Sequence, residues 1–239
     1  TRRSSSAASD VYKRQTYLSS GNGNSNALKV DKLWYTTPVG ERHTVTVGPL
    51  IENYYMHATT PSIYEPVLKA FTLGGNAAGY GASTSPGAGW AYRADNGFAV
   101  SSNITSKNPV LTDEGKSSWA TQVGYTQSNY SVSALLNIKA NGWTDSYFMS
   151  TDGKARPGEG GSSNVGLRSW WRPENSSTAI PSVSVGYDFS ETDAGSNSDT
   201  NSYFVGFNWT DVINPDDKIG LALGPVSYTH LTLPTRIFV

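Results

Sequence analysis

Polar or small side chains recur at every second position in several segments of this chain, and the charged and amide groups among them could line a water-filled passage. Arg168 follows Leu167 in one such segment, and Asp188 stands between Tyr187 and Phe189 in another. A lining of this kind needs no catalytic group, because the width and charge of a wet path decide what passes. We expect seven side chains to face the passage: Arg93, Gln122, Asn137, Lys139, Arg168, Arg172 and Asp188. For Lys139 and Arg172, a place at the end of a strand is an equal alternative.

The longest interval between alternating segments, residues 52–86, holds a second group of candidates. It ends in the glycine-rich run GGNAAGYGAS, and we expect a short helix over residues 63–73 that Gly74 ends. Folded inward, the interval could narrow a passage, and its rings could stack on sugar faces. Packed on itself, it would only cap the molecule, and both alternatives stay open. The rings are those of Tyr54, Tyr55, Tyr64 and Phe71.

Other chemistry has no support in the sequence. Cysteine is absent, His43 and His57 stand apart, and His230 lies near the C-terminus, so we see no metal set and no nucleophile–base pair. We therefore expect no enzymatic activity, no cofactor and no metal. A net charge of −1 does not indicate the basic surface that binds nucleic acid, so we expect no nucleic-acid partner. The acidic residues of the longer intervals fit solvated surface charge better than a calcium site, because none has the spacing of a calcium loop.

Strict alternation of apolar and polar residues predicts that these segments are β-strands. In residues 130–139, Val132 and Leu136 fall on one face while Ser131 and Asn137 fall on the other. Comparable segments occur at residues 118–126, 182–189, 202–209 and 218–224. Only 15% of the residues are charged, against roughly 25% in an ordinary soluble domain, and 24 are glycine. This composition favours extended strands over helices.

Three features suggest that the apolar face points outward to lipid. The segments run to about 8–11 residues, enough to cross an apolar layer when tilted. Their polar face carries mostly Ser, Gly, Asn and Thr, and the large aromatic residues form two belts, as lipid interfaces favour. One belt lies beside short turns and comprises Phe98, Tyr125, Tyr130, Trp171 and Trp209; the other comprises Trp119, Trp143, Phe189 and Tyr203. The diagnostic side chains are Val132, Leu136, Val185 and Phe207, which a soluble β-sandwich would bury under a second layer.

Connection lengths alternate along the chain. Short turns are expected at residues 38–41, 95–97, 127–129, 173–180 and 213–217. Longer loops are expected at residues 52–86, 106–115, 141–161 and 190–201. Short turns at one end and long loops at the other are typical of outer-membrane barrels. A β-sandwich with elaborated loops also fits this pattern.

Both ends of the chain differ from the rest. Residues 1–15 and 225–239 resemble translated linker sequence, and we expect them to be artefactual tails. Residues 16–224 would then be the native part of the chain, and we expect them to form a partial β-barrel. The alternative is that both ends are native termini.

Three stretches carry a family resemblance: KLWYTTPVGERHTVTVG (residues 32–48), SWATQVGYTQSNYSVSALLNIKANGW (residues 118–143) and SYFVGFNWTDVINPDDKIGLALG (residues 202–224). They resemble the cyanobacterial outer-membrane porins related to OprB-type carbohydrate-selective porins, also called iron-uptake porins. The resemblance implies an antiparallel transmembrane β-barrel of roughly 16 strands, of which about ten are present, with short periplasmic turns and long extracellular loops. It also implies a preceding SLH domain and a homotrimer in contact with outer-membrane lipid and lipopolysaccharide.

The function implied is a passive diffusion channel for small hydrophilic solutes and inorganic ions, with sugars or iron species among them. A secreted β-sandwich that binds carbohydrate is the alternative, because the same aromatic side chains could hold a polysaccharide. A glycosidase with paired carboxylates comes third, since most carboxylates fall in loops.

Overall fold

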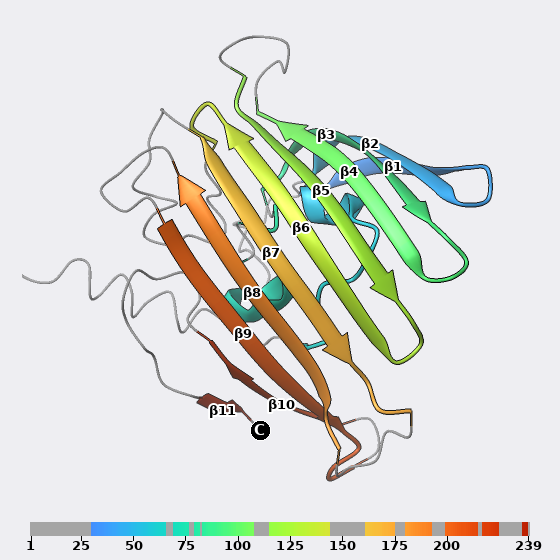
Figure 1. Ribbon diagram of the computed structural model, residues 1–239, viewed down its shortest axis with the longest axis vertical. Helices are drawn as coiled ribbons and strands as arrows, with labels where there is room; N and C mark the ends of the chain where they lie inside the picture. The colour runs from blue at the N-terminus through green and yellow to red at the C-terminus, as the bar shows by residue number, and fades with distance from the viewer. Residues whose placement is uncertain are drawn as a thin grey trace, which may run out of the picture.

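One antiparallel β-sheet accounts for nearly all of the regular structure in the computed structural model (Figure 1). The structure describes residues 30–65, 69–76, 79–81, 83–107, 115–143, 161–174, 180–192, 199–214, 217–224 and 236–238. In these residues the strands are β1 (Leu33–Val39), β2 (His43–Ile51), β3 (Ser85–Arg93), β4 (Phe98–Ser106), β5 (Ser117–Thr126), β6 (Tyr130–Ala140), β7 (Ser162–Trp171), β8 (Ser182–Thr192), β9 (Asp199–Thr210), β10 (Lys218–Leu223) and β11 (Arg236–Phe238).

Neighbours in the sheet are neighbours in the sequence, and every pair is antiparallel. The all-β prediction is therefore confirmed. The described strands form an open sheet with β1 and β11 at its edges, and not a closed barrel. Strands β1–β10 fall within residues 16–224, and β11 pairs with β10 through residues 236–238. Residues 1–15 lie outside the described part of the chain, so the expected tails stay a prediction.

The predicted alternation of short and long connections is confirmed only in part. Turns of three or four residues follow β1, β3 and β5, and connections of 33 and 21 residues follow β2 and β6. The other connections do not alternate, because ten residues follow both β4 and β7, six follow β8 and seven follow β9. Because all neighbours are antiparallel, the short turns lie together at one end of the sheet. Gly40 and Gly97 shape two of them, with φ angles of +69° and +95° that residues with a Cβ rarely adopt.

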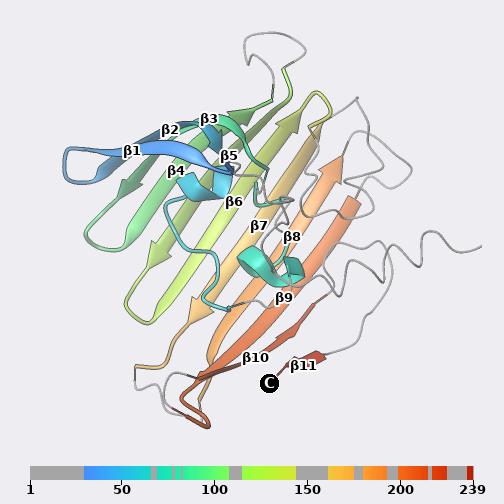
Figure 2. The same ribbon diagram turned by 180° about the vertical axis from the view of Figure 1, so that it is seen from behind.

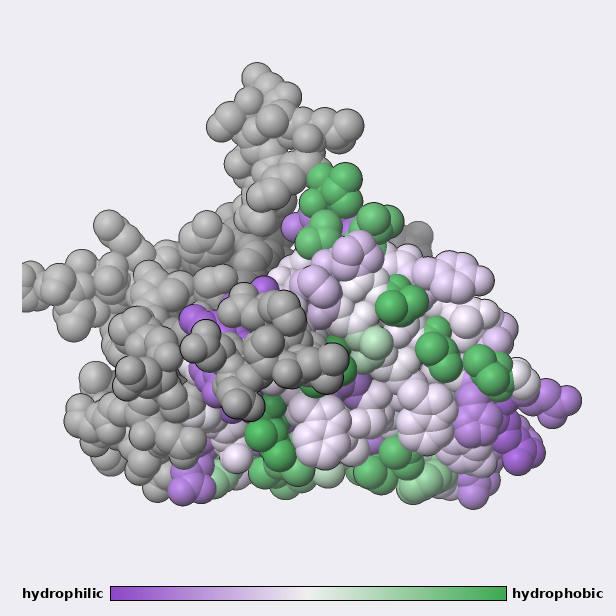
Figure 3. Space-filling view, turned by 90° about the horizontal axis from the view of Figure 1, so that it is seen from above, coloured by the Kyte–Doolittle hydropathy of each residue, from purple (hydrophilic) through white to green (hydrophobic). Residues whose placement is uncertain are grey.

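The two faces of the sheet have the opposite polarity to those of a soluble protein. Val132, Leu136 and Val185 are 48%, 42% and 39% exposed, whereas Gln122 and Asn137 on the other face are fully buried. We call these the outer face and the inner face. Figure 3 shows green apolar residues spaced among pale aromatic ones on the described surface. No second layer of described residues covers the diagnostic apolar side chains, although Phe207 is half-buried.

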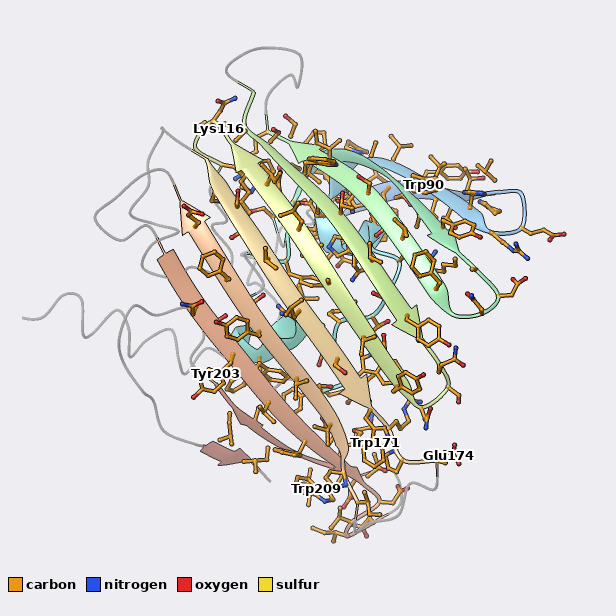
Figure 4. All side chains as sticks on the ribbon, in the orientation of Figure 1. Trp90, Lys116, Trp171, Glu174, Tyr203 and Trp209 are labelled. Carbon is orange, nitrogen blue, oxygen red and sulfur yellow. The ribbon has the colours of Figure 1, made fainter. Side chains whose placement is uncertain are left out.

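Aromatic side chains mark both ends of the outer face. Trp90, Trp171 and Tyr203 project from it in Figure 4, and all three are exposed. Phe98, Tyr130, Trp119 and Phe189 are also exposed, as expected for the two belts. The assignment of Trp143 was wrong, because its ring is buried beneath the ammonium group of Lys107, 4.5 Å from the ring centre. The residue follows the end of β6, where strand alternation no longer fixes its direction.

Two short 3₁₀ helices interrupt the connection between β2 and β3: η1 (Asn53–Met56) and η2 (Lys69–Gly74). Figure 2 shows both lying against the inner face. The helix expected over residues 63–73 is thus shorter and of the 3₁₀ type, although Gly74 ends it with a φ angle of +67°. Within the described residues, no helix has the length and apolar character needed to cross a membrane.

The turn between β9 and β10 depends on Asp217, whose carboxylate accepts hydrogen bonds from the backbone N–H groups of Asn214, Ile213 and Val212 at 2.7–3.0 Å. These bonds lower the pKa of Asp217. We expect Asp217→Ala to speed hydrogen exchange of the three amides while the strands keep their protection. Acid should do the same to the unsubstituted protein as pH falls through the lowered pKa, because the protonated carboxyl is a weaker acceptor. The amides of residues 127–129, measured together by NMR, serve as an internal control, and unchanged exchange in Asp217→Ala would contradict this account.

Candidate functional site

The connection between β2 and β3 folds back over the inner face and forms the candidate site with it (Figure 2). We call the described residues between positions 52 and 84 the inner segment. Buried polar groups need hydrogen-bond partners, because their desolvation otherwise costs about 1–3 kcal/mol each. The inner segment contains little regular structure, so many of its backbone groups are available to serve as those partners.

Glycines on the inner face make room for the inner segment. A Cβ added at Gly124 would lie 2.5 Å from Thr59 Cγ2, and at Gly186 it would overlap the carbonyl oxygen of Gly74. Two further positions follow the same rule: Gly89 lies under Met56, and Gly206 lies under the ring of Tyr64. Larger side chains at these positions would prevent the observed contact.

Gln122 holds the middle of the inner segment through the backbone of Thr59. The Thr59 N–H donates to Gln122 Oε1 at 2.9 Å, and Gln122 Nε2 donates to the Thr59 carbonyl at 3.2 Å. The same Nε2 lies 2.5 Å from the hydroxyl oxygen of Tyr80. Burial raises the pKa of Tyr80 to about 12, so its hydroxyl stays neutral, and the guanidinium of Arg168 lies 4.9 Å from its ring centre.

A chain of side-chain hydrogen bonds fixes the start of the inner segment. The Thr105 hydroxyl donates to Asn53 Oδ1 at 2.9 Å, and Asn53 Nδ2 donates to Asn103 Oδ1 at 2.8 Å. Asn103 Nδ2 then lies 3.1 Å from His57 Nδ1, and His57 Nε2 lies 3.3 Å from the Tyr80 carbonyl oxygen. This end of the site is therefore a continuous polar network between the segment and β4.

A buried ion pair fixes the other end of the inner segment. Arg168 Nη2 donates to Asp188 Oδ1 at 2.7 Å, and both side chains are almost completely buried. The segment completes the site, because the Asn76 N–H donates to Asp188 Oδ2 at 2.9 Å and Arg168 Nε donates to the Leu73 carbonyl at 2.8 Å. Ser202 adds a third donor to the carboxylate at 3.1 Å. Each charge is thus compensated by its partner and by dipoles of the segment.

The predicted loop aromatics form two groups. Tyr64 and Phe71 pack with Phe204, at ring-centre distances of 5.4 and 5.7 Å from it, on the inner face. Tyr55 is exposed and stacks on Tyr54 at 4.4 Å. The interval therefore folds onto the sheet and does not form a separate cap packed only on itself. Whether it narrows a passage stays a prediction.

The predicted lining residues of the strands share the inner face. Five of them are buried: Gln122, Asn137, Lys139, Arg168 and Asp188. The inner segment forms hydrogen bonds with Gln122, Asn137, Arg168 and Asp188. Arg93 is exposed at the short-turn end and donates to the carbonyls of His57 and Ala58 at 3.2 and 3.0 Å. Arg172, also exposed, lies just beyond β7 with its guanidinium 5.6 Å from the ring centre of Trp170. Whether these side chains line a passage stays a prediction.

Sequence reasoning missed Asn53, Asn76 and Asn103 as parts of the site. Their partners are distant in sequence, so no local pattern singles them out. One feature of the sequence could have predicted the docking. Glycine recurs on the polar face of successive strands, where the absence of a side chain lets an inward-folded segment lie close to the sheet. Within the described residues, no group of three or more His, Asp or Glu side chains could hold a metal ion.

Comparisons with family models, curated proteins and solved structures gave no match to this chain. The function is therefore argued from the chain's own residues.

The fit at Gly186 can be tested by adding one methyl group. We expect Gly186→Ala to displace the inner segment, because its Cβ would occupy the space of the Gly74 carbonyl oxygen. Chymotrypsin should then cleave after Tyr64, which is buried in the unsubstituted protein. Ala134→Val, on the exposed outer face, should leave the cleavage rate unchanged. Equal protection of Tyr64 in both variants would refute the role of Gly186.

The ion pair can be tested by a double-mutant cycle. Arg168→Met or Asp188→Leu alone should lower the free energy of unfolding by about 3–5 kcal/mol, because each leaves one buried charge without its partner. The double variant should lose much less than the sum of the two. Denaturant titration in detergent would measure all four proteins, and additive losses would show that the two charges do not interact.

Proposed function

We propose that this chain is part of an outer-membrane porin that lets small hydrophilic solutes and inorganic ions diffuse passively. Its strands would belong to a transmembrane β-barrel, with the outer face toward lipid and the inner face toward the passage. We further propose that the protein belongs with the cyanobacterial OprB-type or iron-uptake porins and works as a homotrimer in contact with lipid and lipopolysaccharide.

The observation that carries the proposal is the reversed polarity of the sheet. Val132 and Leu136 are about half exposed, while the buried face holds amides, hydroxyls and an ion pair. Water would make such an outer face costly, at roughly 25 cal/mol for each Å² of apolar surface left exposed. Hydrocarbon removes that cost, and a closed ring of strands would also satisfy the backbone groups at the sheet edges.

Strand dimensions support the same proposal. Strands β5 to β7 have 10 or 11 residues, which at about 3.3 Å per residue and a tilt of about 45° cross about 23 Å. The apolar band of an outer-membrane barrel is about 25 Å tall. Exposed rings at both ends of the outer face match the places where aromatic residues meet lipid headgroups.

The inner segment suits the constriction of such a passage. It covers polar side chains of β4 to β8 from within, so solutes would pass beside it and not through an empty tube. Arg93 and Arg172 remain exposed and would add positive charge near the short-turn opening.

Planar-bilayer recording tests the proposal. We expect the protein to require detergent, to remain β-rich, and to raise the ion conductance of a bilayer in discrete steps. Leu136→Arg should impair folding into lipid vesicles by about 2–4 kcal/mol, because it places a charge in hydrocarbon. Ser128→Arg, in an exposed turn, is the matched control and should fold normally.

Other outcomes point to other functions. A soluble monomer that binds glycan and leaves bilayers sealed would replace the porin with a carbohydrate-binding β-sandwich module. Glycan hydrolysis that disappears on changing one acidic pair would instead support a glycosidase.

A further inference from the structure

His57 belongs to a hydrogen-bond chain whose direction is fixed. Asn53 Nδ2 donates to Asn103 Oδ1 at 2.8 Å and to the Ser118 carbonyl at 2.9 Å, while Asn53 Oδ1 accepts from the Thr105 hydroxyl. A carbonyl oxygen can only accept, so the Asn53 amide cannot turn over without losing this bond. Asn103 must therefore present its oxygen to Asn53.

This direction determines the state of the imidazole. Asn103 Nδ2 is the group that faces His57 Nδ1 at 3.1 Å, so Nδ1 accepts. His57 Nε2 then carries the proton and donates to the Tyr80 carbonyl oxygen at 3.3 Å. A second proton on Nδ1 would set two donors against each other, and neither asparagine could turn to relieve the conflict.

No anion in the described surroundings would compensate a charged imidazole. Arg93 of β3 donates to the His57 carbonyl, and the titratable groups of the segment beside it are the hydroxyls of Tyr54 and Tyr80. From β4, His57 meets the neutral amide of Asn103. The side chain is 7% exposed, and this burial lowers the pKa of His57 to about 4.

We propose that His57 is an acid-sensitive latch, and that its protonation releases the inner segment from the inner face. His57 lies directly after η1, between two points where the inner segment is bonded to the sheet: Asn53 and the Thr59 peptide that Gln122 holds. Expulsion of its ring would therefore separate this part of the segment from the inner face. If the porin proposal also holds, release would widen the passage in acid.

The expected size of the effect follows from proton linkage. A released His57 would titrate near 6.5, its ordinary value, whereas the docked residue resists protonation until about pH 4. The released form thus binds more protons, and the docking equilibrium constant should fall about tenfold per pH unit through this interval. The loss reaches about 160-fold at pH 4 and levels off at about 300-fold below that pH.

Hydrogen exchange measured by mass spectrometry between pH 7 and 4, on the full chain in detergent, tests the latch. After correction for the intrinsic rates, residues 54–64 should exchange faster as pH falls, while β6 and β7 stay protected. His57→Gln should remove this response, because it replaces the titrating ring with a neutral amide. His43→Gln, at an exposed histidine of the outer face, is the matched control and should respond like the unsubstituted protein.

A second variant tests whether the His57→Gln result reflects the lost titration or a local disturbance of packing. Asn103→Asp places a carboxylate beside His57 Nδ1, which should favour the imidazolium and keep the segment docked through the same pH interval. The comparison also separates His57 from Glu52, Glu65 and Asp188, the carboxylates that bond within or to the segment. The proposal is overturned if all variants respond alike, if the segment never responds, or if the strands lose protection together with it.

Conductance measurements test the latch and the porin function separately. Bilayers that stay sealed at every pH, with acid release still seen by hydrogen exchange, would contradict the porin function and support the latch. A conductance without pH dependence, together with a segment that stays docked at pH 4, would contradict the latch and support the porin function.

Discussion

A sheet that buries its polar face must satisfy that face without bulk water, and the rest of this structure depends on that constraint. The inner segment meets it with backbone groups and a few side chains. Gln122 pairs with the Thr59 peptide groups, while the Asn76 N–H and the Leu73 carbonyl complete the surroundings of the Asp188–Arg168 pair. Without these contacts each buried donor or acceptor of the inner face would remain unpaired, at a cost in free energy.

The same constraint links the two faces of the sheet. Successive side chains of a strand point to opposite sides, so a sequence that alternates polar and apolar residues places them on opposite faces. Exposed Val132, Leu136 and Val185 are thus the counterpart of buried Gln122 and Asn137. This pairing of faces is what a membrane barrel requires, and it is the basis of the proposed transport function.

Much of the sheet could be predicted because the alternation of polar and apolar residues is visible within each strand's own sequence. Alternation predicted the strands and the side chains that share the inner face, and turn spacing predicted part of their connections. The docking of the inner segment could not be predicted in detail, because its bonds join residues far apart, as between Asn76 and Asp188, and many involve backbone groups common to all residues. Trp143 was misplaced for a related reason: beyond the end of β6, no period fixes the direction of a side chain.

The chain order of the sheet also bears on how the molecule is assembled. Each hairpin can add to the one before it, so the strands need only local closure of the chain. The inner segment is different, since Thr60, Ile63 and Asn76 bond to residues that follow them by 110, 121 and 112 positions. Early-synthesised backbone must therefore wait, without its final partners, until β7 and β8 exist. During that interval it is the part of the nascent polypeptide most in need of protection from premature association.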